Sequence, residues 1–270
     1  MSGGAVQLRP APALAPFVDW YGWYESDLPP ACETSVPTGL CALMVNLAED
    51  ELRWYDSAGR VHRRSGIGVC AARPGPVTID TAEQRRTICV AFRPAGAYPF
   101  FAVPPGALDE PVVDLADLWG PPAARDLRDR MLAAPTPHAA LLTLQSVLAQ
   151  RAARPLEADS GILAAAAALG RGAGVAEVSD RLGTTTGSLR RRFAERMGLT
   201  PKRYGRIRRL HRLLDGVVGH SDVDWSRAAA DSGYFDQAHM VNEFRALTGV
   251  TPGAYRPRSP GERNHLPAEA

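Results

Sequence analysis

The chain has 270 residues, of which 45% are hydrophobic and 22% charged, and this composition argues for a folded protein of two domains and against a wholly disordered one. The net charge of +2 is unevenly distributed. Residues 171–270 contain 17 Lys and Arg against 11 Asp and Glu (net +6), whereas residues 1–170 contain 14 against 18 (net −4). The second half is therefore the candidate for nucleic-acid binding.

No apolar run approaches the ~20 residues needed to span a bilayer, and the first residues lack a basic stretch followed by an apolar one. We therefore expect a cytoplasmic protein without a membrane partner. Four cysteines occur without a Cys-x-x-Cys pair, and we expect them to be reduced small hydrophobes in the interior. They are Cys32, Cys41, Cys70 and Cys89.

Short strands are predicted between residues 33 and 92. Apolar runs at 40–47 and 87–92, and shorter ones at 52–55 and 77–79, are separated by Gly, Pro or Asp. This spacing predicts an antiparallel barrel or sandwich. The segment 94–111, rich in Pro, Gly and aromatic residues, is expected to be irregular.

Helical periodicity follows at 123–133 and 138–152. These helices either pack on the β unit or form a dimer seam, and we expect packing within the chain. The first half has no His-rich metal pattern, nucleophile elbow or phosphate loop, so we predict no catalytic site, metal or cofactor. Six aromatic residues either line a pocket or pack in the core: Trp20, Tyr21, Trp23, Tyr24, Trp54 and Tyr55.

One helical unit occurs twice in the basic half. The pattern Phe-x-x-x-x-Gly-x-Thr-Pro-x-x-Tyr begins at Phe193 and again at Phe244. In each copy a capping residue, Thr185 or Asp236, precedes an apolar stripe, which predicts a short helix that begins at the cap and buries one face. A glycine turn and another short helix come before it, in the order found in DNA-binding units.

The segments after the two copies are expected to begin new helices. Thr200 and Thr251 suit N-caps, each followed by proline at the first helical position. The helix from Pro201 is expected to reach about Val218, and a helix of that length would fix the separation of the two units.

The second copy contains the most specific residues: Ala229, Gly233-Tyr234, Asp236-Gln237-Ala238-His239-Met240, Phe244-Arg245, Gly249, Thr251-Pro252 and Tyr255-Arg256. With these residues, the segment 160–256 resembles the C-terminal domain of the AraC/XylS family of bacterial transcription regulators. The resemblance implies two helix-turn-helix units that bind DNA. The first half is similar in layout to the family's β-barrel sensing domains with a helical tail, which implies effector binding, dimerisation or both.

We therefore expect an α+β protein in three parts. Residues 1–155 form a β-rich, barrel-like effector-binding or dimerisation domain with C-terminal helices. Residues 156–258 form an all-α DNA-binding domain of two helix-turn-helix units joined by a long helix, and residues 259–270 a disordered tail.

Residues near the N-terminus of a recognition helix reach base edges in the major groove. Arginine suits guanine, Gln and Asn suit adenine, and Ala or Val contacts a thymine methyl group. Glycine cannot read a base, and many family members have Arg where Asn242 stands. The predicted base-reading residues are Gly187, Ser188, Arg190 and Arg191 in the first copy and Gln237, Ala238, Val241 and Asn242 in the second.

Phosphate contacts set affinity and position rather than sequence preference. We assign them to Thr186, Lys202, Arg203, Arg206 and Arg245. With the two recognition helices about 34 Å apart, the protein would cover two successive major-groove segments. His211, His220 and His239 are expected to be structural.

The leading hypothesis is a sequence-specific transcription regulator whose first half binds a small-molecule effector or dimerises. One alternative is a constitutive or architectural DNA-binding factor without a ligand. Another is an enzyme of the alkyl-transfer repair type fused to the same DNA-binding module, but the cysteine spacing does not resemble its zinc-bound cluster. The expected partners are double-stranded DNA and, as further candidates, RNA polymerase, a small molecule and a second copy of the chain.

Overall fold

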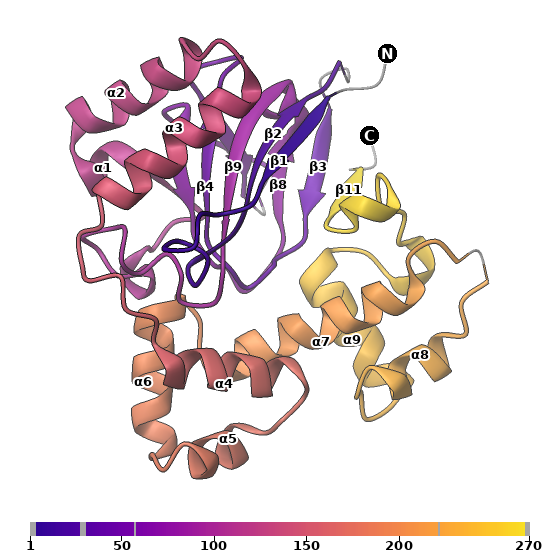
Figure 1. Ribbon diagram of the computed structural model, residues 1–270. Coiled ribbons are helices and arrows are strands. Elements are labelled where there is room, and N and C mark those ends of the chain that lie inside the picture. The colour runs from indigo at the N-terminus through magenta and orange to yellow at the C-terminus, as the bar shows by residue number, and fades with distance from the viewer. Residues whose placement is uncertain (1–3, 28–30, 57, 221, 268–270) are drawn as a thin grey trace.

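The computed structural model describes residues 4–27, 31–56, 58–220 and 222–267. A β-rich half with three covering helices is followed by a helical half, and the last described residues return to the β-rich half (Figure 1). No helix in these ranges is long and apolar enough to cross a membrane.

Two antiparallel sheets form the β-rich half. One has the strand order β1-β2-β9-β4-β7-β10 and the other β11-β3-β8-β5-β6. The first sheet contains β1 (Ala5–Leu8), β2 (Val18–Glu25), β9 (Arg86–Phe92), β4 (Ala42–Asn46), β7 (Ile67–Cys70) and β10 (Val112–Asp114). The second contains β11 (His265–Pro267), β3 (Cys32–Ser35), β8 (Val77–Asp80), β5 (Leu52–Tyr55) and β6 (Val61–Arg64).

Three helices cover the first sheet (Figure 1): α1 (Leu115–Trp119), α2 (Pro121–Leu132) and α3 (Pro137–Gln150). In β4, half-buried and buried side chains alternate from Ala42 to Val45, with Leu43 and Val45 fully buried. Leu127 and Leu144 from the helices join the same apolar cluster, and α3 contacts β1 and β2. The expected packing of these helices within the chain is confirmed.

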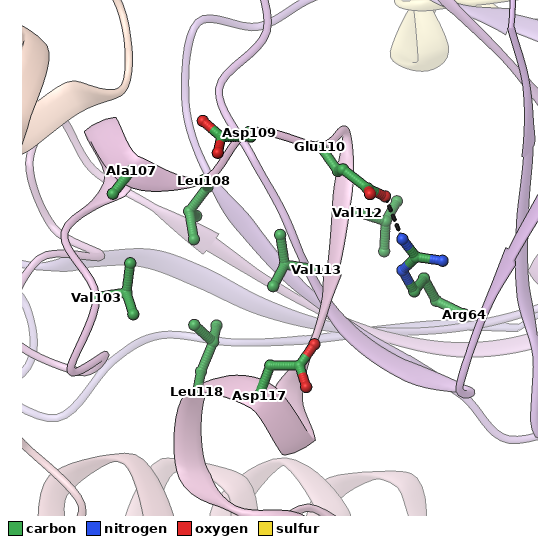
Figure 2. Close-up of a pocket in the computed structure, with 10 residues that line it drawn as sticks. All are labelled: Arg64, Val103, Ala107, Leu108, Asp109, Glu110, Val112, Val113, Asp117 and Leu118. Carbon is green, nitrogen blue, oxygen red and sulfur yellow. Dashed lines mark hydrogen bonds and ion pairs between the residues drawn. The ribbon is translucent and has the colours of Figure 1, made fainter.

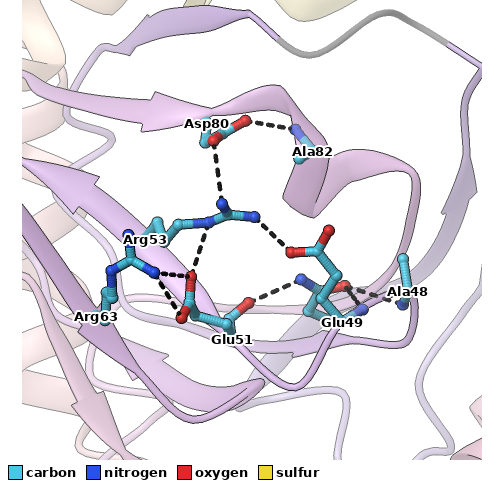
Figure 3. Close-up of polar contacts among 8 residues, drawn as sticks. Ala48, Glu49, Glu51, Arg53, Arg63, Asp80 and Ala82 are labelled. Atoms are coloured by element: carbon cyan, nitrogen blue, oxygen red, sulfur yellow. Dashed lines mark hydrogen bonds and ion pairs between the residues drawn. The ribbon is translucent and has the colours of Figure 1, made fainter.

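The second sheet carries a charged network on β5 (Figure 3). The Arg53 guanidinium contacts Glu49, lies 3.0 Å from Glu51 Oε1 and 3.7 Å from Asp80 Oδ2 on the neighbouring strand β8. Arg63 on β6 also contacts Glu51, at 3.1 Å. Because these contacts join three adjacent strands, they favour one register of this sheet.

The helical half contains α4 (Ser160–Gly170), α5 (Val175–Arg181), α6 (Thr186–Met197), α7 (Pro201–Val217), α8 (Trp225–Asp231) and α9 (Gln237–Thr248). α7 runs between the α4–α6 group and the α8–α9 group (Figure 1). One small core, with Ile162, Leu189 and Phe193, belongs to the first group. The buried residues Leu210 of α7 and Phe244 of α9 belong instead to the large cluster that includes the β-rich half.

The α+β class is confirmed, and so are the four strands expected from apolar runs, which appear as β4, β5, β8 and β9. The sequence did not indicate the edge strands β1, β6, β10 and β11. The segment 94–111 also contains a 3₁₀ turn, η2 (Pro105–Ala107). The four cysteines are free; Cys41 is buried and the other three are half-buried.

Two expectations about the C-terminus are wrong. Thr251 makes no capping hydrogen bond and the segment after it is a single 3₁₀ turn, η3 (Pro252–Ala254). The chain turns there because Tyr255 packs edge-on against Phe244, with ring centroids 5.7 Å apart. The tail predicted to be disordered from residue 259 is ordered through Pro267, with a 3₁₀ turn, η4 (Pro260–Glu262), and strand β11. Residues 268–270 lie outside the described ranges.

Candidate DNA-binding surface

The first unit consists of α5, a turn and α6. Thr185 caps α6, since its hydroxyl accepts a hydrogen bond from Ser188 N at 3.1 Å. Leu189, Phe193 and Met197 are buried, and the Phe193 ring packs edge-on against Tyr204 of α7 at 5.4 Å. The stripe predicted to be buried is therefore confirmed, and the opposite face of α6 is turned outward.

That outward face holds the predicted base-reading residues. Gly187, Arg190 and Arg191 are exposed and Ser188 is half-buried. An open hollow of about 560 Å³ lies at the turn beside them, lined by Asp180, Gly183, Thr184, Thr185 and Ser188. Arg192, one residue further on, instead pairs with Asp159, the cap of α4, at 2.8 Å.

The second unit repeats this arrangement with α8 and α9. Asp236 caps α9 by accepting a hydrogen bond from His239 N at 2.7 Å. Met240, Phe244 and Leu247 are buried, and the Trp225 ring of α8 packs against Phe244 at 5.9 Å. The prediction that α9 buries one face is thus confirmed.

The predicted readers of the second unit differ in their surroundings. Gln237, Ala238 and Asn242 are exposed, whereas Val241 is half-buried and packs against the core. Ser226 Oγ of α8 donates to Gln237 Oε1 at 3.0 Å. This bond orients the Gln237 amide at the start of α9.

Four of the five residues assigned to phosphates are exposed: Thr186, Lys202, Arg203 and Arg245. Arg206 is different, because its Nε lies 2.6 Å from Glu243 Oε1. Glu243 is buried and also approaches Arg209 at 3.4 Å and His239 at 3.6 Å. In this structure Arg206 therefore holds α7 against α9.

Sequence reasoning missed Glu243. The signal was present, since Glu243 lies three residues after Met240 and one before Phe244, within the apolar stripe of α9. A carboxylate at such a position is stable only when cations meet it. Arg206 and Arg209 lie one turn apart on the facing side of α7 and supply that charge.

Arg212 of α7 connects α4, which packs with the first unit, to the second unit. Its guanidinium donates to the carbonyl oxygen of Gly170 at the end of α4, and to that of Ser232 in the turn of the second unit at 3.1 Å. Thr200 caps α7 by accepting from Arg203 N at 3.3 Å. One helix thus carries contacts to both units, which limits their relative motion.

The β-rich half contacts the rear of α6. Tyr98 Oη donates to Glu195 at 3.2 Å, and the Arg196 guanidinium lies 3.6 Å from the centre of the Tyr98 ring. η2 packs so closely that a Cβ at Gly106 would lie 2.4 Å from the Ala194 carbonyl oxygen. These contacts fall on the C-terminal half of α6 and leave its N-terminal half outward.

A second contact joins the loop before β4 to α7. His211 is buried, and its Nε2 donates to the Pro37 carbonyl oxygen at 2.9 Å. Burial lowers the pKa of His211 to about 4, which outweighs the opposing effect of this hydrogen bond. Gly39, at φ +77°, lies where a Cβ would be 3.2 Å from the Tyr204 ring. The expected structural role of His211 agrees with these contacts.

A third contact is made by the chain after the second unit. β11 pairs antiparallel with β3, and the buried Glu33 of β3 binds Arg258 at 2.7 Å and His265 at 3.1 Å. Arg258 also pairs with Glu262, and this hydrogen bond holds the pKa of Glu262 below its usual range. The helical half is therefore attached to the β-rich half at both of its ends.

A hollow of about 230 Å³ lies beside η2 (Figure 2). Its walls are mixed: the apolar residues are Val103, Ala107, Leu108, Val112, Val113 and Leu118, and the charged residues are Arg64, Asp109, Glu110 and Asp117. Arg64 pairs with Glu110. The Gly106 turn that packs on α6 adjoins this hollow, so a molecule bound there would lie one turn of chain from the first recognition helix.

None of the six aromatic residues weighed as pocket walls lines either of these two hollows. Tyr21 and Trp54 are buried, and burial raises the pKa of Tyr21. Within the described ranges, no group of three or more His, Cys, Asp or Glu side chains is arranged to hold a metal ion.

Two family models match different parts of the chain. Residues 178–258 match the family described as a helix-turn-helix domain, and residues 6–114 match the Domain of unknown function DUF6597. No curated protein matches the chain.

Solved structures of ToxT from Vibrio cholerae are similar in the arrangement of elements. For one ToxT structure the sequence identity is 8% and the TM-score 0.45, and the match covers 94% of this chain and 97% of the ToxT chain. Wild-type ToxT bound to an unsaturated fatty acid has 9% identity, a TM-score of 0.46 and coverage of 94% of both chains. ToxT bound to (E)-4-(8-methylnaphthalen-1-yl)but-3-enoic acid has 8% identity, a TM-score of 0.46 and coverage of 94% and 97%.

Proposed function

We propose, from the premise that the C-terminal part of this chain is an AraC-type helix-turn-helix domain, that this DNA-binding transcription regulator recognises a specific operator with both of its units. The observation that carries the proposal is the repeated geometry of α6 and α9. Each begins at a side-chain cap, buries one stripe and turns its first residues outward. Helix N-termini presented in this way enter the major groove.

The two units would contribute differently to DNA binding. Arg190 and Arg191 can each donate two hydrogen bonds to guanine, and the lack of a side chain at Gly187 allows the backbone to approach closely. Gln237 and Asn242 offer the paired donor and acceptor that adenine requires. The first unit would therefore supply more of the affinity, and the second more of the base discrimination.

The remaining assigned residues complete the surface. Ser188 would contact a base edge, and Ala238 and Val241 thymine methyl groups. Thr186, Lys202, Arg203 and Arg245 would bind phosphates. Arg206 would do so only by leaving Glu243, and we assign it a smaller contribution than the sequence indicates.

An electrophoretic shift assay with DNA from upstream of the protein's own gene tests the operator proposal. We expect binding at moderate salt that random competitor DNA does not abolish, and about a tenfold or greater loss in Arg190→Ala. Arg227→Ala is the matched control, since Arg227 is an exposed arginine of α8 that lies on neither recognition helix. A wild-type protein without preference for its operator would refute the proposal.

We further propose that the N-terminal domain modulates DNA binding. Support comes from its contacts with α6 of the first unit, with α7 between the two units, and with β11 after the second unit. The modulator would be a small molecule, with the hollow beside η2 as its candidate site, or a second copy of the chain. RNA polymerase is the expected partner if the regulator activates transcription.

Thermal-shift measurements on the full chain against a metabolite collection test this second proposal. A ligand at 100 times its dissociation constant adds about 2.7 kcal/mol to stability, and should also change the affinity for the operator. If no compound shifts the melting temperature, and operator affinity is independent of protein association state, the constitutive alternative holds.

A further inference from the structure

The turn of the second unit carries a phenyl ring in solvent. Phe235 is 91% exposed, whereas the other large exposed apolar side chains of the described chain reach at most 42%. Burying such a ring is strongly favourable, so a fully exposed one contributes nothing to folding and adds to the risk of aggregation. Its position one residue before the cap of α9 calls for a specific explanation.

Comparison of the two units shows that the second has an added residue. The first unit begins its helices at Val175 (α5) and Thr186 (α6), and the second begins its helices at Trp225 (α8) and Gln237 (α9). The interval between the two helix starts is therefore one residue longer in the second unit.

Backbone hydrogen bonds locate the insertion. Thr184 N donates to Ser179 O at 3.0 Å, and Tyr234 N donates to Ala229 O at 3.0 Å, so Thr184 and Tyr234 close equivalent turns. Thr184 is followed directly by the cap Thr185, whereas Phe235 separates Tyr234 from the cap Asp236. Phe235 therefore has no counterpart in the first unit.

The neighbours of Phe235 are fixed, so the ring is held outward. Tyr234 is buried, with its ring 4.9 Å below the Arg209 guanidinium and 5.5 Å from His239. Asp236 has an extended backbone and is committed to capping α9. With both neighbours anchored, the ring stands at the same end of α9 as the exposed Gln237 and Ala238.

We propose that Phe235 is a further specificity residue of the second unit, whose ring contacts thymine C5-methyl groups at the edge of the major groove. A partner that binds this ring must offer apolar groups, and it must be negatively charged overall because residues 171–270 carry a net charge of +6. Duplex DNA meets both conditions, because the thymine methyl is the apolar group exposed in the major groove. This inference rests on the proposed function.

Competition binding of the full chain to its operator tests the inference. Phe235→Ala is expected to lower operator affinity about 5- to 20-fold, within the range of single base contacts, with little change for random DNA. Its melting temperature should equal that of the wild type, since the ring is exposed. Leu132→Ala, which removes a 42% exposed side chain on α2, is the matched control and should bind as the wild type does.

Replacing operator thymines one at a time with deoxyuridine identifies the methyl contact. At the contacted position, the wild type should lose affinity several-fold and Phe235→Ala should lose none. Phe235→Leu, which keeps an apolar side chain, should retain part of the sensitivity.

The outcomes separate this inference from the proposed function. A wild-type protein that does not prefer its operator refutes both. If operator preference is unchanged in Phe235→Ala, only the role of the ring is refuted. An equal loss of affinity for operator and random DNA would also refute it, because it would indicate a sugar or phosphate contact. Intact DNA binding with lost transcription would assign the ring to a protein partner and overturn the inference.

Discussion

Replacement of the buried His211 by Asn should remove one source of acid sensitivity. Burial, helped by the nearby charges of Arg208 and Arg263, lowers the pKa of His211 from 6.5 to about 4, against the opposing effects of the Pro37 hydrogen bond and Asp215. The folded protein thus holds this histidine neutral. Below pH 6.5 the unfolded chain binds a proton that the folded chain does not, so stability falls as the pH drops and levels out below about 4.

The size of this loss of stability follows from the pKa of His211 in the unfolded chain, 6.5, and in the folded protein, about 4. Between pH 7.5 and 5.0, His211 alone should cost about 2 kcal/mol of unfolding free energy, or roughly 4–8 °C in melting temperature for a chain of this size. Protonation also favours any state in which α7 has separated from the Pro37 loop, because His211 then meets water. Acid should therefore weaken the contact between the two halves before the whole chain unfolds.

Thermal melts of wild type and His211→Asn at the two pH values measure the effect. The variant should be less stable at pH 7.5, since it loses buried contacts, but should lose less on acidification. Other titrating groups act equally in both proteins and cancel in the difference. Equal losses in the two proteins would refute the assignment of acid sensitivity to His211.

Three further predictions concern other contacts. Glu243→Gln should lower the unfolding free energy by about 1–2 kcal/mol in urea melts, with part of the effect screened because Arg206 is 37% exposed; no change would mean that the cluster is not stabilising. Arg190→Ala should cause the larger loss of operator affinity and also weaken binding to random DNA, whereas Gln237→Ala should reduce mainly operator preference. Identical profiles of the two variants in competition assays would contradict these different contributions. Glu33→Gln should release β11 and hasten tryptic cleavage at Arg258 and Arg263, which unchanged digestion kinetics would disprove.

The helix-turn-helix units could be predicted because their signals are local. A cap such as Thr185 or Asp236 and the stripe behind it act within a dozen residues, and the structure places both as expected. The pattern of apolar runs likewise located β4 and β9. It did not indicate strand order, which depends on pairings between distant segments.

The contacts between the halves were beyond such reasoning. Tyr98 and Glu195 are 97 residues apart in sequence, and Glu33 and Arg258 are 225 apart. The residues around each of these side chains do not indicate which distant residue it contacts. Arg206 shows the same limit, since its sequence neighbourhood predicts a phosphate contact and does not indicate the ion pair that it makes with the buried carboxylate of Glu243.

The pairing of β11 with β3 has a kinematic consequence. A domain joined to its neighbour by a single linker can swing through a wide cone. Here the DNA-binding half is fastened at its start, through the linker into α4, and again at its end, through β11. Contacts at α6 and α7 lie between these two attachments, so a rearrangement of the β-rich half would move both recognition helices together.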